Sequence, residues 1–233
     1  MIRSIDTLQK NFEILQKRQE TTASNLANSQ TTGFQSKKVF QQTLEEVNVH
    51  NFQGGIAADK KQELGSWTFG NELAQTALNT SKGAFKETGR MSDFALTQEG
   101  YFTIAMPDGS TSYTKNGNFA LNDQNQYITQ AGYLVLNEQN QPVLVGTDDF
   151  QVRRFNQPEA LENIGNTYYQ TEENGEVILN PVLEKGYLEM ANVEVADEMT
   201  ALLQTSREFE ANQKVLSTVN DTLKKAANEI GRF

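Results

Sequence analysis

A heptad repeat near the end of the chain constrains the fold most strongly. An apolar residue recurs at every seventh position, in the order Leu202, Phe209, Leu216, Leu223 and Ile230. Seven residues are slightly fewer than two ideal helical turns, so a helix that keeps these side chains on one face must supercoil against a partner. The other half of the expected seam lies three residues earlier and is mostly small or polar: Met199, Ser206, Gln213, Asn220 and Ala227. We therefore expect a long C-terminal helix that packs against other helices.

The start of the chain carries a complementary helical pattern. Ile5, Leu8, Phe12 and Leu15 follow one another at spacings of three, four and three, with no Gly or Pro between them. This pattern predicts a helix over roughly residues 3–28 that stops before Gly33. The two terminal helices are predicted partners, and the pattern leaves open whether they pack within one chain or between chains.

Short alternating runs, separated by Gly, Asn and Asp turns, fill the middle of the chain. Such runs predict an antiparallel β domain, and they include Phe94–Leu96, Tyr101–Ile104 and Tyr133–Leu136. A local repeat supports this interpretation, because the segment Ala120–Gln126 recurs fifteen residues later as Val135–Gln141. Each copy places a polar turn after an apolar strand end, and we expect Asn125 and Asn140 to adopt positive φ there.

These patterns predict an α+β fold. Long N- and C-terminal helices form a coiled-coil-like helical domain, and the centre forms a small antiparallel all-β domain. The expected segments are residues 1–40 for the N-terminal helix and turn, 41–82 for an extended connector, 83–190 for the β domain and 191–233 for the C-terminal helix.

Composition excludes several classes of function. The chain has 233 residues and a net charge of −10, and the acidic excess lies in its middle, which argues against nucleic acid as a partner. It has no cysteine, so neither a disulfide framework nor a thiolate site is available. It also has no apolar run long enough for a signal peptide or a membrane span, so we expect no membrane insertion.

The acidic residues give little support to catalysis. Adjacent carboxylates, as in Asp148-Asp149 and Glu172-Glu173, point in different directions on a strand or loop and are usually solvated. His50 is the one histidine of the sequence, so a histidine metal cluster or a triad is not supported. We expect no catalytic or metal-binding residues, no cofactor and no small-molecule substrate.

Three ordered blocks of the sequence resemble the flagellar rod and hook proteins. The first is Asn25–Phe34, and the third is Leu188–Met199 followed by Arg207–Asn212. The second block lies between them and resembles the core of that family's β domain; it consists of Thr88–Leu96, Glu99–Phe102 and Tyr113–Phe119. The blocks spread over nearly the whole chain, and their order makes the resemblance specific.

The resemblance implies a structural subunit of the bacterial flagellar rod. Such a subunit is exported by the flagellar type III apparatus without a cleaved signal peptide, and its terminal helices assemble with copies of itself and with other axial proteins into a hollow drive shaft in the basal body. The short sequence after Gly146 argues against the hook protein, which carries an additional outer domain. Proximal and distal rod positions both stay open. The alternative is a phage-tail or surface-fibre subunit, because fibres also combine β domains with coiled-coil ends.

The predicted assembly interface follows the apolar positions of both ends. It comprises Ile5, Leu8, Phe12, Leu15, Leu26, Phe34, Met199, Leu202, Phe209, Leu216, Leu223 and Ile230. Asn25, Asn28 and Gly33 are expected to form a fixed turn in which the Asn side chains bond backbone groups left free by the ending helix. Phe34 is expected either to contact another subunit or to anchor the turn within the chain.

Overall fold

The computed structural model describes residues 2–43, 46–51, 62–68, 71–157, 160–165 and 167–230. The fold is α+β, with one helix at each end and antiparallel strands between them, as predicted. The chain divides into two compact units. Unit 1 consists of Met1–Ala23, Lys38–Ala77 and Met199–Phe233, and unit 2 of Ser24–Lys37 and Leu78–Glu198.

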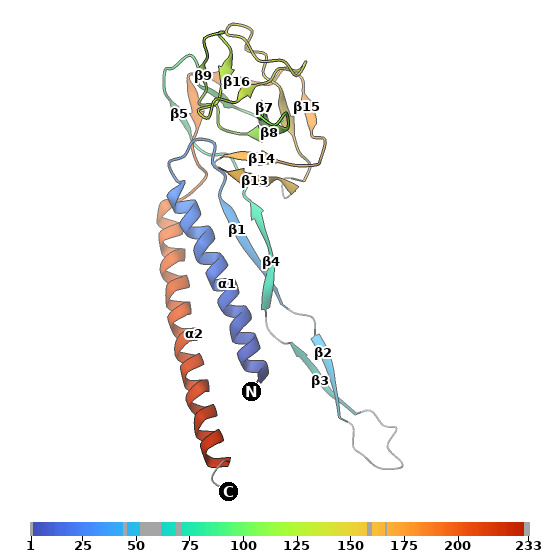
Figure 1. Cartoon of the computed structure of the whole chain (residues 1–233), viewed down its shortest axis with the longest axis vertical. Coiled ribbons are helices and arrows are strands. Elements are labelled where there is room, and N and C mark those ends of the chain that lie inside the picture. Colours follow the sequence, from blue (N-terminus) through green and yellow to red (C-terminus); the bar gives the residue numbers. More distant parts are fainter. Residues whose placement is uncertain are drawn as a thin grey trace. The chain divides into compact units, whose positions relative to one another are not determined.

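Two antiparallel helices dominate unit 1 (Figure 1). They are α1 (Ile2–Ala27) and α2 (Val195–Ile230), and neither contains Gly or Pro. The rings of Phe12 and Phe209 meet edge to face with their centres 5.0 Å apart. Nearby, the guanidinium of Arg18 lies 3.9 Å from the carboxylate of Glu208. The predicted N-terminal helix is confirmed to within one residue at either end.

The half-buried face of α2 follows the heptad, with one correction. Leu202, Phe209, Leu216 and Leu223 are half-buried, as the repeat predicts. Within the chain, the residues three positions after them are also buried or half-buried, namely Thr205, Asn212, Val219 and Ala226; of the positions expected three residues before, Ser206 is half-buried and the others that the repeat named are exposed. Residues three positions before and three positions after a heptad residue both lie on nearly the same helical face. Which of the two is buried within the chain depends on where α1 packs. Met199 is 50% exposed as a result.

Two antiparallel strand pairs complete unit 1. The first is formed by β1 (Lys37–Thr43) and β4 (Asn71–Leu78), and the second by β2 (Glu46–Asn51) and β3 (Gln62–Thr68). Val47 pairs with Trp67 in the second. The sequence predicts an extended connector here and no particular strands, because polar residues occupy both faces of these segments and no clear alternation results.

Unit 2 is built around one antiparallel sheet, seen in the upper part of Figure 1. Its main path is β13-β14-β8-β7-β11-β10-β9, and β12 pairs with both β7 and β15. Two strand pairs, β16 with β6 and β17 with β5, join the segment before the sheet to the segment after it. The strands are β5 (Phe85–Glu87), β6 (Phe94–Leu96), β7 (Tyr101–Ala105), β8 (Thr111–Thr114), β9 (Ala120–Leu121), β10 (Tyr127–Ile128), β11 (Leu134–Val135), β12 (Val152–Arg154), β13 (Glu162–Gly165), β14 (Tyr168–Gln170), β15 (Glu176–Ile178), β16 (Leu183–Lys185) and β17 (Tyr187–Glu189).

Aromatic rings fill the core of unit 2. Phe102 is fully buried, and its ring centre lies 5.1 Å from that of Phe119 and 5.6 Å from that of Phe150. A second buried cluster surrounds Tyr169 on the other side of β7 and β8. Offset and edge-to-face ring pairs of this kind stabilise a core beyond the area that they bury.

The repeated turns have the same geometry in both copies. Asn125 and Asn140 each have a φ of 56°, as predicted. In the first copy the Asn122 side chain accepts hydrogen bonds from the backbone of Gln124 and Gln126. Asn137 does the same in the second copy, so the repeat in sequence is a repeat in structure.

Candidate functional site

The three sequence blocks meet within unit 2, at a place that we call the motif junction. It consists of Asn25–Lys37 together with residues Asn79, Gly83, Lys115, Asn116, Glu189, Asn192 and Glu198. The first block supplies a turn, the second supplies the backbone against which it packs, and the third supplies side chains that hydrogen-bond both.

Asn25 and Asn28 lie at the end of α1, but, contrary to the prediction, their side chains do not bond the backbone groups that the ending helix leaves free. The Asn25 amide is almost fully buried; its nitrogen donates to the Lys37 carbonyl and to the Glu198 carboxylate, both at 2.9 Å. Its oxygen accepts from the Lys37 N–H, also at 2.9 Å. The Asn28 side chain donates to the Ser24 carbonyl at 2.9 Å, which also accepts from the Asn28 backbone N–H at 3.1 Å.

Gly33 is required for two independent reasons. Its φ is +69°, a conformation that costs other residues free energy. A Cβ atom at this position would also lie 2.3 Å from the backbone nitrogen of Asn116. Its N–H donates to the Glu189 carbonyl at 2.8 Å, so the turn is pressed between the second and third blocks.

Asn192 is the main connector of the third block. Its side-chain oxygen accepts from the Ser36 N–H at 2.7 Å. Its nitrogen donates to the carbonyls of Asn79 and Ser81 at 2.7 and 2.8 Å. One amide therefore ties together three segments that are far apart in the sequence, and the backbone of Asn192 also donates to the Phe34 carbonyl.

A buried ion pair lies beneath the turn. The ammonium of Lys115 is 3.4 Å from the carboxylate of Glu189, and both side chains are about 95% buried, with 4% and 5% of their area exposed. Glu189 also accepts from the Gly83 N–H, and Lys115 lies over the ring of Tyr101. Removing one partner of such a pair leaves a buried charge uncompensated, so the pair fixes which segments meet here.

Tyr101 links the turn to the core of the sheet. Its hydroxyl donates to the side-chain oxygen of Gln35 at 2.8 Å, in a buried setting. Burial raises the pKa of Tyr101 above its ordinary value, because the phenolate would lose its hydration. The side chain is therefore neutral at physiological pH and acts as a donor.

The predicted interface residues fall into two groups. Leu15 and Phe34 are buried within the chain, and Phe34 anchors the turn of unit 2. The half-buried group lies along the helices and contains Ile5, Leu8, Phe12, Leu26, Leu202, Phe209, Leu216 and Leu223, whereas Met199 is exposed. Ile230 is the last residue of α2, and its side chain lies outside the described part of the structure.

Sequence reasoning gave no roles to Lys115, Asn116, Glu189 and Asn192. All four stand inside the blocks that carry the family resemblance. A buried Lys and Glu are unusual enough to signal a pair, but nothing in the sequence says that residues 74 positions apart will meet. Only the fold brings them together.

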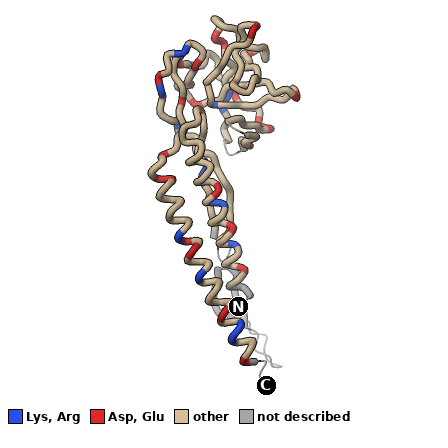
Figure 2. The backbone as a smooth tube through the Cα atoms, turned by 60° about the vertical axis from the view of Figure 1, so that its left-hand side comes forward, with Lys and Arg blue, Asp and Glu red and all other residues tan. Residues whose placement is uncertain are grey.

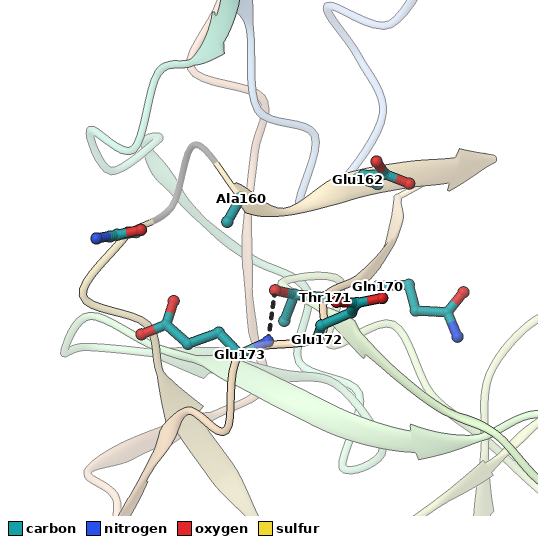
Figure 3. A pocket seen from close by; sticks show the side chains of 7 residues that line it. Ala160, Glu162, Gln170, Thr171, Glu172 and Glu173 are labelled. Atoms are coloured by element: carbon teal, nitrogen blue, oxygen red, sulfur yellow. Dashed lines mark hydrogen bonds between the residues drawn. The ribbon is translucent and has the colours of Figure 1, made fainter.

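A pocket of about 620 Å³ opens near β13 and β14, lined by Gln157, Ala160, Glu162, Gln170, Thr171, Glu172 and Glu173. Figure 3 shows the side chains of Glu172 and Glu173 extending in opposite directions, and the backbone of Glu173 donates to the Thr171 hydroxyl at 3.1 Å. Within the described ranges, no group of three or more His, Asp or Glu side chains is placed to hold a metal ion. His50 lies in β2, where the description covers the backbone alone.

Among the described residues, neither α1 nor α2 combines the length and the apolar character that a membrane-crossing helix needs.

Comparisons with known families match all three blocks. Residues 184–229 match the C-terminal family of the flagellar basal body rod FlgEFG proteins, and residues 95–179 match the D1 domain of the flagellar hook proteins FlgE/F/G. Residues 14–35 match the flagella basal body rod protein family. None of these descriptions names a catalytic activity.

Similar curated proteins span the whole chain. The flagellar basal-body rod protein FlgG of Borreliella burgdorferi is 27% identical, and the alignment covers 100% of both chains. FlgG of Buchnera aphidicola from Acyrthosiphon pisum is 29% identical over 95% of this chain and 94% of its own. The flagellar hook-basal body complex protein FlhO of Bacillus subtilis is 25% identical over 100% of both.

Proposed function

The chain belongs to the flagellar basal-body rod protein family, and we propose that it is a structural subunit of the bacterial flagellar rod that assembles through its terminal helices. The fibre alternative is not favoured, because the similar proteins named above are flagellar rod or hook-basal body proteins over their whole lengths.

The observation that carries the assembly mechanism is the incomplete burial of the helices. Within one chain, α1 covers one side of α2, and Leu202, Phe209, Leu216 and Leu223 stay only half-buried. Fully burying a Leu or Phe side chain stabilises by about 1.5–3 kcal/mol, so the part still exposed is a substantial driving force for contact with other helices. Coiled-coil-like packing between subunits would complete their burial.

In this proposal the helices of many subunits line a hollow tube that transmits torque from the motor to the hook. Unit 2 gives each subunit a rigid body, because side-chain hydrogen bonds and the buried ion pair of Lys115 with Glu189 join the segments of the motif junction. Partners are copies of the same chain and other axial proteins of the flagellum. We infer location in the basal body, reached through the flagellar export apparatus without a cleaved signal peptide.

The first experiment deletes the gene and examines the cells by electron microscopy. Basal bodies isolated from the parent strain are probed for the protein by mass spectrometry. Loss of hooks and filaments on deletion, with the protein present in parent basal bodies, is the expected result. Normal flagella in the deletion strain, or parent basal bodies without the protein, would refute the rod role.

A second experiment tests the helices directly. Leu216→Asp or Leu223→Asp puts a charge on the half-buried face, and we expect either variant to be absent from basal bodies while its tyrosine circular dichroism remains that of folded unit 2. Thr222→Asp, on an exposed side of the same helix, is the matched control and should be incorporated. Incorporation of Leu216→Asp at the normal level would contradict the role of the seam.

A further inference from the structure

The outer face of α1 carries a line of acidic and amide side chains. Exposed residues follow one another at spacings of three and four, which places them on one side of the helix: Asp6, Gln9, Glu13, Gln16 and Glu20. Gln9 donates to Glu13 and Gln16 to Glu20, and the Glu20 carboxylate also lies 3.7 Å from the ammonium of Lys17. We call this the acidic face of α1.

The outer face of α2 combines basic and apolar side chains. Arg207 and Lys214 are exposed, and neither forms an ion pair with another described residue. Met199 and Leu203 stand on the same side, two turns and one turn before Arg207, and are 50% and 61% exposed. Glu210 lies between the two cations. We call this the basic face of α2, and Figure 2 shows the charged positions along both helices.

The spacing of charges on the two faces matches. Glu13 and Glu20 are seven residues apart, about 10.5 Å along a helix, and so are Arg207 and Lys214. In an antiparallel pair, Glu20 can face Arg207 while Glu13 faces Lys214. Two such pairs would fix the register of the contact, because ion pairs at the rim of an interface contribute more to specificity than to affinity.

The two faces cannot meet within one chain. The contact of Phe12 with Phe209 and the ion pair of Arg18 with Glu208 use other sides of both helices. The ring contact also shows which levels correspond, since residue 12 of α1 lies beside residue 209 of α2. A second copy displaced from this level by about six residues, or about 9 Å along the helix, brings its Glu20 opposite Arg207 and its Glu13 opposite Lys214.

We propose that the acidic face of α1 in one copy of this chain docks against the basic face of α2 in the next copy. The inference rests on the proposed function and names the surfaces through which neighbours meet. Met199 and Leu203 would pack near the small residue Ala23, which is exposed at the end of the acidic face. Because the two faces differ, each copy uses its acidic face for one neighbour and its basic face for another. The contact therefore propagates into a ring or a helical array.

Cross-linking in assembled rods tests this contact without changing the four charged residues. Because the chain has no cysteine, the double variant Gln16→Cys/Glu210→Cys carries the only two thiols of the chain. Oxidation of isolated rods should give a ladder of dimers, trimers and higher species on a denaturing gel. Each single variant should give no ladder, and Phe12→Cys/Phe209→Cys should close within one chain and leave the protein monomeric.

Charge exchange gives an independent readout. Glu13→Lys/Glu20→Lys and Arg207→Glu/Lys214→Glu should each reduce the number of hooks per cell at least tenfold, and the four changes together should restore most of it. If rods contain the Gln16→Cys/Glu210→Cys variant but oxidation gives no ladder, the inference is overturned and the proposed function stands. The same holds if the four charge changes together do not restore hooks. Absence of the unmodified protein from rods would overturn both.

Discussion

The two units satisfy their apolar residues in different ways. In unit 2 the rings of Phe94, Phe102, Phe119 and Phe150 are at most 2% exposed, and each contacts others of the set. In unit 1 the ring pair of Phe12 and Phe209 remains half-buried. Unit 2 thus encloses an aromatic core within one chain, whereas the ring pair between the helices of unit 1 stays partly exposed. A subunit that assembles as proposed needs both features: a unit with a core of its own, and helices whose apolar side chains become fully buried only against other subunits.

The chain offers separate optical probes for this comparison. All seven tyrosines lie between residues 101 and 187, within unit 2. The single tryptophan, Trp67, lies in unit 1. Denaturant unfolding followed by tyrosine circular dichroism and by tryptophan fluorescence therefore reports the two units separately.

The largest expected effect comes from the core of unit 2. Phe102→Ala should lower the free energy of unfolding by about 3–5 kcal/mol, because it removes a fully buried ring and leaves a cavity. The matched control is Phe209→Ala in unit 1, which should leave the tyrosine-detected transition unchanged. Equal effects of the two variants on that transition would show that the units do not unfold separately.

Gly33→Ala tests the motif junction. The variant combines an unfavourable φ with a Cβ atom against the Asn116 backbone, and we expect a loss of about 2–5 kcal/mol in the tyrosine-detected transition. Gly109→Ala is the control: its φ is +82° but no atom lies within 4 Å of the added Cβ, so it should cost only about 1–2 kcal/mol. Similar losses for both variants would mean that the close approach to Asn116 is not important.

Asn192→Ala should destabilise unit 2 by about 2–3 kcal/mol, measured in the same way. The variant leaves the Ser36 N–H and the carbonyls of Asn79 and Ser81 without their partner. Asn212→Ala in α2 is the control in unit 1, because its side chain makes no hydrogen bond with another described residue. An unchanged transition for Asn192→Ala would remove this residue from the set that holds the junction.

The smallest effect is a dependence on alkaline pH that is confined to unit 2. Burial raises the pKa of Tyr169 from 10.0 to about 12. The unfolded chain therefore loses this proton first, so the stabilisation is fully present below pH 10 and is lost as the pH rises through 12, by about 1.4 kcal/mol for each pH unit. Tyr169→Phe should reduce the slope, as measured by denaturant midpoints between pH 9 and 12. A slope of the same size in tryptophan fluorescence would contradict the assignment to unit 2.

Regular patterns made much of the fold predictable. The heptad of Leu202 and Phe209 and the pattern of Ile5 and Phe12 predicted both helices, and the repeated Asn turns predicted positive φ at Asn125 and Asn140. The strands of residues 37–78 were missed because their side chains alternate little in polarity. The heptad also left open which neighbouring positions of α2 pack within the chain, since spacings of three and four are equivalent until a partner is placed.

The candidate site was predictable in its turn and not in its connections. Residue type alone predicts that the helix ends here, because amides and glycine suit a helix end and the segment contains Asn25, Asn28 and Gly33. The meeting of Lys115 with Glu189, or of Ser36 with Asn192, depends on which strands pair across the whole unit. Such contacts carry no local signature, and the family resemblance supplied the blocks without saying that they touch.

The bond between the Ser36 N–H and Asn192 spans 156 residues. When a chain emerges from its first residue, the Asn25–Phe34 turn therefore appears long before the residues of the third block to which it hydrogen-bonds. The Asn192 amide and the Glu189 carboxylate come only when most of the chain is through. The hydrogen bonds that close the motif junction can form only then, so the folding of unit 2 waits for nearly the whole chain.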